Sequence, residues 1–396
     1  ASSCWTSTCC RTVVRRGQPG GSRCPSARLH GSGRLPHLME RFGFVGLPNA
    51  GKSSLYNALA GGGALAAPYA FATVDPNVGV AKVLDSRLDA LAEMSQSKNV
   101  VPTAVQFVDI AGLVKGASQG EGLGNRFLAH IREVDAVVFV LRAFEDTDVP
   151  GSSDPAEQLE ILELELITAD LEALEKHIDK RRKAARSNPA QAPEVAAMEA
   201  AIDVLGGGTP VWRAGLDEDT MALLKAEQLL TSKPVIALVN LGEDQLDEPD
   251  TYLAGVRALL GDTAPVIGLS IQLEAEAAML DPEDRTEMLE ALGLGEGALP
   301  TFLHTAYQLL GLRTFFTTGE KESRAWTFRE GFTAPQTAGV IHTDFERGFI
   351  RAETIGWDVL LEAGSWSKAR DEGTLRIEGK DYKVVDGDVM EFRFNV

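Results

Sequence analysis

Gly46-Leu-Pro-Asn-Ala-Gly51-Lys52-Ser53 is the stretch of sequence that decides the fold. A short apolar run, Arg41-Phe-Gly-Phe-Val45, precedes it, and a helical stretch follows it. A glycine-rich loop that ends in Gly-Lys-Ser between a strand and a helix is the pattern of a phosphate-binding loop. The sequence therefore predicts a nucleotide site in an α/β domain.

The loop offers several groups that can hold a nucleotide and its metal ion. Backbone N–H groups, helped by the positive end of the following helix, are expected to cradle the α- and β-phosphates. Lys52 is the expected catalytic cation at the β/γ oxygens, and the Ser53 hydroxyl is an expected Mg²⁺ ligand. Asn49 either helps to bind a monovalent cation or stiffens the loop. The expected nucleotide-binding residues of the loop are Asn49, Ala50, Gly51, Lys52, Ser53 and Ser54.

A second motif, Asp109-Ile-Ala-Gly112, ends a strand expected at residues 105–110. Asp109 is expected to hold Mg²⁺ through water, and Gly112 is placed to meet the γ-phosphate. Thr73, which lies between the two motifs, is a candidate for completing the Mg²⁺ coordination when the γ-phosphate is present; a solvated loop threonine is the alternative. Lys52, Thr73 and Gly112 form the expected catalytic set.

Apolar strands alternate with helical stretches along most of the chain. Further strands are expected at residues 136–141, 234–240 and 265–270. This alternation predicts a parallel sheet with helices on both faces. We expect the nucleotide domain to comprise residues 39–154 and 226–298.

The segment between these parts, residues 155–225, has a different pattern. Its apolar residues are spaced alternately three and four apart, which predicts two antiparallel helices with a shared seam. Ordinary amphipathic helices on the sheet are the alternative. The seam residues are Leu164, Ile167, Leu171, Leu174 and Ile178, then, after a break at 187–193, Val195, Met198, Ile202 and Leu205.

Short strands rich in Gly, Thr and aromatic residues begin at about residue 311, and the Asp386-Gly387 turn fits a β-rich pattern. We expect a separate module at residues 311–394, in which His342-Thr-Asp-Phe345 is structural or faces RNA.

The first 38 residues differ from the rest of the chain. They contain six arginines, all four cysteines and no Asp or Glu. They are either a transit peptide, which would favour the plastid stroma, or the translation of DNA upstream of a natural start at Met39. On both hypotheses residues 1–38 lie outside the fold. Without them the formal net charge falls from −19 to −25, and the cysteine-free remainder fits the cytoplasm.

Composition also excludes several classes of partner. No apolar run approaches the roughly 18–20 residues of a membrane span, so we expect a soluble protein. The strong negative charge repels phosphates, so DNA is not expected as a partner, and any RNA contact must be local. We expect a monomer.

Several stretches resemble signatures of the YchF subfamily of Obg-like ATPases, and the resemblance runs from about residue 41 to the end. It implies an OBG-type G-domain, an inserted helical coiled-coil arm and a C-terminal TGS domain of the ubiquitin-like (β-grasp) type. It also implies an ATP-preferring enzyme that binds the ribosome, at the large subunit. The stretches are 46–53, 75–79, 109–118, 120–125 and 392–396.

Asn240-Leu241-Gly242-Glu243 stands where GTPases carry Asn-Lys-x-Asp. Leu in place of Lys, and the longer Glu in place of Asp, spoil the recognition of guanine. Asn240 and a backbone group of Leu241 are instead expected to serve the adenine edge, as the resemblance also implies. ATP is therefore the expected substrate and Mg²⁺ the cofactor. A GTPase of ribosome assembly, and a binding protein in which ATP only sets the conformation, are the alternatives.

Leu113 lies where Ras-type enzymes have a glutamine that orients water. A leucine side chain cannot do so, and catalysis is left to backbone groups, the metal, Lys52 or a partner. The loop at 146–154 also lacks the histidine that members of the resembled subfamily often carry. A histidine-dependent mechanism is therefore in doubt for this chain.

Six basic residues lie where the first arm helix approaches its turn. We expect this basic tip, or the TGS domain, to contact the RNA of the large ribosomal subunit; a solvated helix end is the alternative. The six are Lys176, Lys180, Arg181, Arg182, Lys183 and Arg186.

Overall fold

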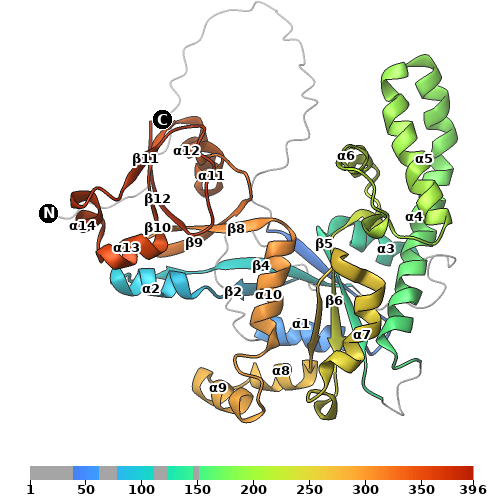
Figure 1. Cartoon of the computed structure of the whole chain (residues 1–396), viewed down its shortest axis with the longest axis horizontal. Coiled ribbons are helices and arrows are strands. Elements are labelled where there is room, and N and C mark those ends of the chain that lie inside the picture. Colours follow the sequence, from blue (N-terminus) through green and yellow to red (C-terminus); the bar gives the residue numbers. More distant parts are fainter. Residues whose placement is uncertain (1–38, 62–77, 111–122, 146–150, 396) are drawn as a thin grey trace, which may run out of the picture. The chain divides into compact units, whose positions relative to one another are not determined.

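The computed structural model describes residues 39–61, 78–110, 123–145 and 151–395. A six-stranded sheet, in the order β2-β4-β1-β5-β6-β7, carries the phosphate-binding loop (Figure 1). All neighbouring strands are parallel except β2 and β4. The expected α/β class is confirmed, with one antiparallel edge strand added. The strands are β1 (Arg41–Val45), β2 (Val78–Val83), β4 (Thr103–Asp109), β5 (Ala136–Arg142), β6 (Val235–Asn240) and β7 (Val266–Leu269).

Helices cover both faces of this sheet, so its central strands are apolar on both sides and every residue of β5 is buried. One face packs against α1 (Lys52–Gly61), α8 (Ile271–Ala277) and α10 (Ala298–Leu309), around the stacked rings of Phe44 and Phe107. The other face packs against α3 (Leu123–Glu133), α7 (Pro249–Leu260) and the first half of α4 (Pro155–Ser187). The helix α9 (Pro282–Ala291) follows α8.

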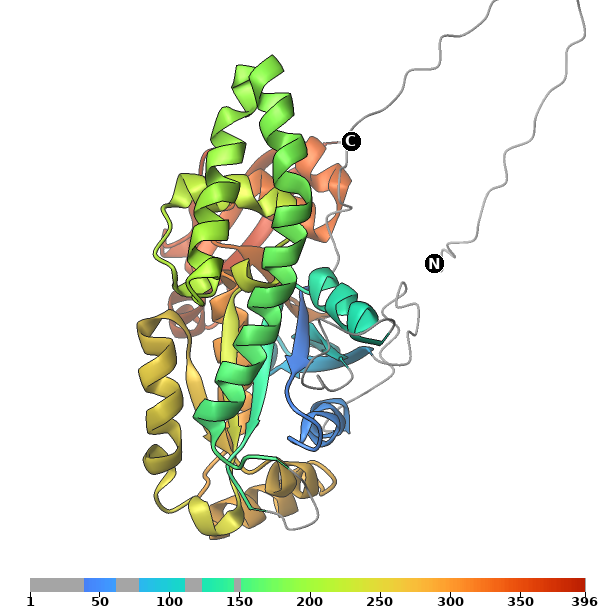
Figure 2. The same ribbon diagram turned by 90° about the vertical axis from the view of Figure 1, so that its right-hand side faces the viewer.

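The arm consists of α4 (Pro155–Ser187) and α5 (Ala192–Gly206), which lie side by side in Figure 2. Asn188 ends α4, and a short 3-10 turn, Pro189–Gln191, reverses the chain. The seam prediction is wrong at Leu164, whose side chain is 60% exposed. The first half of α4 buries other residues against the sheet, and Leu164 faces away from both the sheet and α5. The remaining seam residues are buried or partly buried in one cluster.

Four short helices return the chain from the arm to β6, and two more lie between β6 and β7. The first four are Val211–Arg213, α6 (Glu218–Leu224), Lys225–Glu227 and Leu230–Ser232, and the other two are Glu243–Gln245 and Gly261–Thr263. None of the helices in the described ranges is both long enough and apolar enough to span a membrane.

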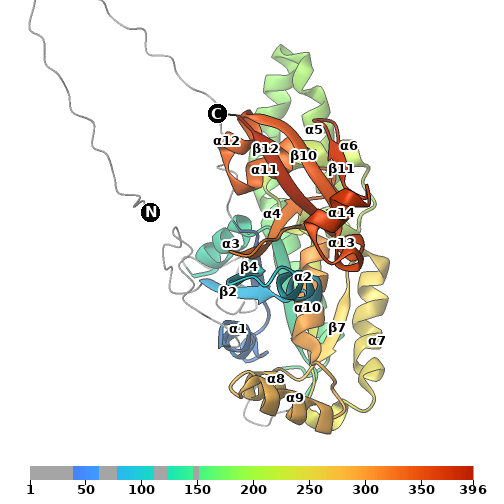
Figure 3. The ribbon, with the colours of Figure 1, turned by 90° about the vertical axis from the view of Figure 1, so that its left-hand side faces the viewer.

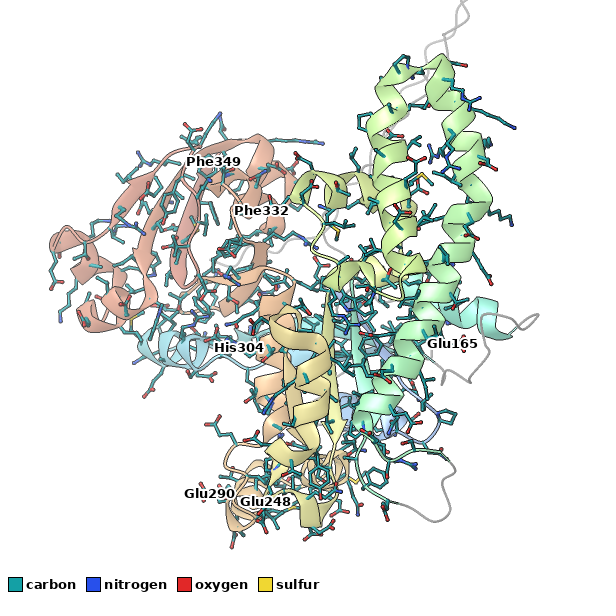
Figure 4. The ribbon with its side chains drawn as sticks, turned by 45° about the vertical axis from the view of Figure 1, so that its right-hand side comes forward. Glu165, Glu248, Glu290, His304, Phe332 and Phe349 are labelled. Atoms are coloured by element: carbon teal, nitrogen blue, oxygen red, sulfur yellow. The ribbon has the colours of Figure 1, made fainter. Side chains whose placement is uncertain are left out.

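A second six-stranded sheet, in the order β11-β10-β12-β8-β9-β3, forms the C-terminal module (Figure 3). Phe332 and Phe349, labelled in Figure 4, belong to the apolar cluster around α11 on one face of this sheet. Its strands are β8 (Leu312–Thr317), β9 (Ser323–Arg329), β10 (Phe349–Gly356), β11 (Arg376–Glu378) and β12 (Asp388–Phe394). Its helices are α11 (Ala334–Ile341), α12 (Thr343–Arg347), α13 (Trp357–Ala363) and α14 (Trp366–Asp371).

One strand of the second sheet comes from the first half of the chain. Between β2 and β4 the chain leaves the nucleotide-binding sheet and forms α2 (Ser86–Met94) and β3 (Val100–Val101). β3 pairs in parallel with β9, and Leu88 and Leu91 of α2 lie in the apolar cluster of the C-terminal module. Nη1 of Arg87, in α2, donates a hydrogen bond to Oδ2 of Asp386 at 2.7 Å. This excursion is not apparent from the sequence pattern.

Candidate nucleotide-binding site

The phosphate-binding loop requires glycine at two positions. A Cβ on Gly46 would lie 2.4 Å from the carbonyl oxygen of Val140 on the neighbouring strand β5. Gly51 has a φ of +104°, and a Cβ there would lie 2.6 Å from Nδ2 of Asn240. Any side chain at these positions would displace backbone or a buried amide, so the loop can approach the sheet closely only with glycine.

Lys52 begins α1 and is held beneath the loop. Its side chain is 7% exposed, and its Nζ donates hydrogen bonds to the carbonyl oxygens of Gly46 and Leu47, at 3.1 and 2.8 Å. Burial lowers the pKa of Lys52, and the nearby charge of Asp109 opposes that shift. The cation is therefore fixed against the carbonyl oxygens of the loop that the sequence predicts will hold the phosphates.

Ser53 and Asp109 lie together across the sheet edge. The Ser53 hydroxyl donates to Oδ2 of Asp109 at 3.0 Å, from the first turn of α1 to the last residue of β4. A hydroxyl and a carboxylate are the hard oxygen donors that Mg²⁺ prefers. The residues present therefore fit this metal ion. Nearby, the pKa of Tyr56 is raised by burial and by the charge of Asp109.

Thr73, Gly112 and Leu113 lie outside the described residues. Their expected roles stay predictions. Ser54 is described and is exposed on α1.

Asn240 joins three elements rather than presenting a free amide. Its Nδ2 donates to the carbonyl oxygen of Ala50 at 3.1 Å, and its Oδ1 accepts from the backbone N–H of Ile271 at 3.1 Å. The side chain is 6% exposed. Asn240 thus ties the end of β6 to the phosphate-binding loop and to the start of α8. Sequence reasoning missed Ile271, because nothing in the local pattern signals a backbone partner.

The loop after β6, residues 241–245, is held by contacts within the protein, and its expected backbone recognition of adenine stays a prediction. The Leu241 side chain is 2% exposed and its N–H donates to the carbonyl of Leu269 at 2.9 Å, so this N–H is already occupied. Glu243 is exposed at the start of a 3-10 turn. Gln245, which sequence reasoning also missed, accepts from the Gly242 N–H at 2.9 Å and donates to the carbonyl of the residue after β5 at 3.2 Å. The loop is therefore held from both sides.

Arg142 ends β5 beside Asn240 and was also missed. It is 4% exposed, and its Nη1 has no hydrogen-bond partner in the described chain. Gln158 of α4 accepts from the Arg142 N–H at 2.9 Å and donates to its carbonyl at 2.7 Å, as a neighbouring strand would. The arm helix is thereby joined to the carboxyl edge of the sheet.

Two family descriptions match this chain. The one described as "50S ribosome-binding GTPase" matches residues 41–183, and the one described as "Protein of unknown function (DUF933)", named YchF-GTPase_C, matches residues 312–395. Together they cover the loop, the start of the arm and the C-terminal module.

Relatives extend the similarity over most of the chain. "Ribosome-binding ATPase YchF" of Bacillus subtilis (strain 168) is 46% identical over 361 residues, covering 89% of this chain and 99% of that protein. The protein of the same name from Escherichia coli O157:H7 is 44% identical over 359 residues, with the same coverage.

Two solved structures are similar to this chain over most of its length. "Structure of the Schizosaccharomyces pombe YchF GTPase" has a TM-score of 0.81 and 35% identity, and the match covers 89% of this chain and 97% of that one. A GTP binding protein from Pyrococcus horikoshii OT3, with a TM-score of 0.59 and 21% identity, shares the fold and covers 90% and 100%. From its phosphate-binding loop to its C-terminal strand, this chain belongs to the YchF family.

Proposed function

We propose that this protein is a Mg²⁺-dependent ATPase that works as a nucleotide switch on the large ribosomal subunit. The observation that carries the proposal is the buried Lys52 at a loop that requires glycine. The Ser53 hydroxyl and Oδ2 of Asp109 lie 3.0 Å apart nearby. Asn49, Ala50, Gly51 and Ser54 complete the phosphate cradle. The proposed domains keep the boundaries 39–154 with 226–298, 155–225 and 311–394.

Different residues are proposed to act on different parts of the triphosphate. Backbone N–H groups of the loop hold the α- and β-phosphates, and Lys52 stabilises charge on the β/γ oxygens. Ser53 and Asp109, with Thr73, would hold Mg²⁺, which supplies charge neutralisation when bound. Gly112 would contact the γ-phosphate through its backbone. Leu113 cannot orient water, so the attacking water depends on backbone groups or on a partner.

ATP is the proposed substrate because the guanine-recognising side chains are missing. Leu241 is turned into the core and Glu243 is longer than the aspartate that accepts from guanine. The amide of Asn240 is bonded to the protein at both ends, so we propose that it positions the loop and that the base is recognised by backbone groups nearby. The bacterial relatives are named ATPases, whereas the Schizosaccharomyces pombe protein is named a GTPase.

Calorimetric titration tests the choice of nucleotide. We expect ATP to bind more tightly than GTP, and Glu243→Asp to narrow the difference, while Glu248→Asp, exposed in the same loop and labelled in Figure 4, leaves it unchanged. A tenfold preference for GTP, about 1.4 kcal/mol, would favour the alternative of a GTPase in ribosome assembly. Multiple-turnover rates with and without ribosomes separate an enzyme from an ATP-gated binding protein.

The ribosome contact is proposed at the arm, on part of the basic tip. Arg181 pairs with Glu227 at 3.1 Å, and Arg182 pairs with Glu199 at 2.8 Å, so both are engaged within the arm region. Three exposed lysines have no ion pair in the described chain and recur at positions i, i+4 and i+7, on one side of α4. We call Lys176, Lys180 and Lys183 the lysine stripe.

A row of unpaired lysines on a protein of net charge −19 fits local contact with RNA phosphates. Bacterial relatives are named for ribosome binding. Co-sedimentation with isolated large and small subunits tests which one is bound. Binding to the small subunit alone would contradict the proposal.

A further inference from the structure

Strand β12 is paired along its whole length on one edge, but at a single position on the other edge. Its edge towards β10 is paired from Asp388 to Phe394. Its edge towards β8 is paired only where Val389 lies opposite Phe316. Along residues 390–394, therefore, no strand of the described chain pairs with this second edge. Unpaired N–H and C=O groups on such an edge are a template for another strand.

The chain after β8 is drawn away from β12 by hydrogen bonds to other elements. The Thr318 hydroxyl lies 3.2 Å from the carbonyl oxygen of Leu91 and 2.8 Å from the hydroxyl of Ser95, both on the α2 side. The Thr317 hydroxyl accepts from Nε1 of Trp326 at 2.9 Å. These bonds hold the end of β8 and the residue after it against the α2 region and β9 rather than against β12.

A cleft of about 570 Å³ is lined by this open part of β12. β12 contributes residues 390–393, the end of β8 and the residue after it contribute Thr317 and Thr318, and the facing helices contribute Phe345, Trp366 and Arg370. The ring of Phe345 is stacked on that of Phe394 at 3.9 Å between centroids. The site, which we call the β12 cleft, combines a strand edge with aromatic and cationic side chains.

The charged side chains at the β12 cleft have a formal excess of one positive charge, since Arg351, Arg370 and Arg393 face Glu353 and Glu391. Glu353 is paired with Arg370 at 2.9 Å and with Arg393 at 3.6 Å, and Glu391 is paired with Arg393 at 3.2 Å. The Glu353 side chain is 11% exposed, against 57% for Arg370 and 48% for Arg393, while Glu391 is 47% exposed and paired with Arg393. Arg351 adds a further positive charge beside Glu353. On a chain of net charge −19, such a patch is complementary to an acidic ligand.

We propose that the β12 cleft binds an extended acidic peptide segment of a partner protein, which pairs with the free edge of β12 as an added strand. Main-chain hydrogen bonds to the edge supply affinity, and alternate side chains of the peptide face opposite walls. One set of side chains packs against Phe345 and Trp366. The acidic set meets Arg370 and Arg393. This surface is separate from the nucleotide site and from the lysine stripe.

Single-stranded nucleic acid is the competing occupant, because arginines and aromatic rings also bind phosphates and bases. Nucleic acid has no repeating row of N–H and C=O groups at strand spacing. The open edge of β12 therefore favours the peptide. An extended peptide satisfies all three features of the cleft together: the edge, the aromatic wall and the exposed arginines.

A library of random heptapeptides displayed on phage, selected on the full chain, is the probe. We expect enriched sequences that alternate acidic and large apolar residues. The synthetic form of an enriched peptide should bind about tenfold more weakly to Arg370→Ala, and normally to Lys368→Ala, which removes an exposed charge from the same helix outside the cleft. Thermal unfolding of both variants checks that the fold is retained.

Backbone pairing has its own test. N-methylation of alternate residues in the peptide should abolish binding in one of the two registers, and the unmodified peptide should slow amide hydrogen exchange in residues 390–394. The proposal is overturned if no peptide is enriched, or if N-methylation in either register has no effect. It is also overturned if a ten-nucleotide RNA protects residues 390–394 and displaces the peptide-selected phage.

Discussion

Replacing Asn240 by alanine separates a positioning role from the recognition of adenine. The change removes two hydrogen bonds and leaves the carbonyl of Ala50 and the N–H of Ile271 buried without partners. A buried polar group left unsatisfied costs about 1–3 kcal/mol. We therefore expect Asn240→Ala to lower the free energy of unfolding by about 2–4 kcal/mol, measured by urea denaturation.

The same variant should weaken ATP and GTP binding by similar factors, because the lost bonds hold the loop that binds phosphates common to both. Asn57→Ala, an exposed change on α1, is the control and should alter neither quantity. Two results would refute the reasoning. The first is a stability equal to that of the control. The second is an ATP-to-GTP affinity ratio that changes tenfold, since that would place the Asn240 amide against the base.

Three further predictions concern chemistry, partner and pH. Lys52→Ala should reduce ATP hydrolysis by at least about 100-fold, whereas Leu113→Ala should change it modestly; equal losses in a phosphate-release assay would give Leu113 a direct role. Neutralising the lysine stripe should flatten the salt dependence of ribosome co-sedimentation by about 2–3 units of slope, and an unchanged slope would move the contact elsewhere. Burial raises the pKa of Tyr307 from 10.0 to about 12. Between these two pH values the unfolded chain has lost the Tyr307 proton and the folded chain has kept it, so the free energy of unfolding falls as pH rises. Tyr307→Phe should lessen that fall, as measured by alkaline denaturation.

The phosphate-binding loop was predictable because its information is local. The two glycines, Lys52 and Ser53 lie within a single short stretch, and the strand before them fixes their direction. Asp109 lies beside Ser53 because the carboxyl ends of parallel strands meet at one edge of a sheet, and its role with Mg²⁺ stays a prediction.

Residues whose partners are distant along the chain could not be predicted in the same way. Leu164 fits the seam spacing, yet it is exposed because α4 changes its packing partner from the sheet to α5 midway along its length. Gln158 and Gln245 are polar residues without a motif, and each holds backbone of another element. Periodicity describes the face of one helix, and it carries no information on which element that face meets.

The excursion through α2 and β3 also constrains when the protein can fold during its synthesis. Arg87 and Asp386 are 299 residues apart, and in the described chain Leu88 and Leu91 lie in an apolar cluster whose members outside α2 all follow residue 315. During synthesis, the apolar face of α2 therefore stays exposed until β12 has left the ribosomal exit tunnel. The segment that joins β2 to β4 is therefore completed last, and a protein truncated before β8 would carry a permanently exposed, aggregation-prone helix in its middle.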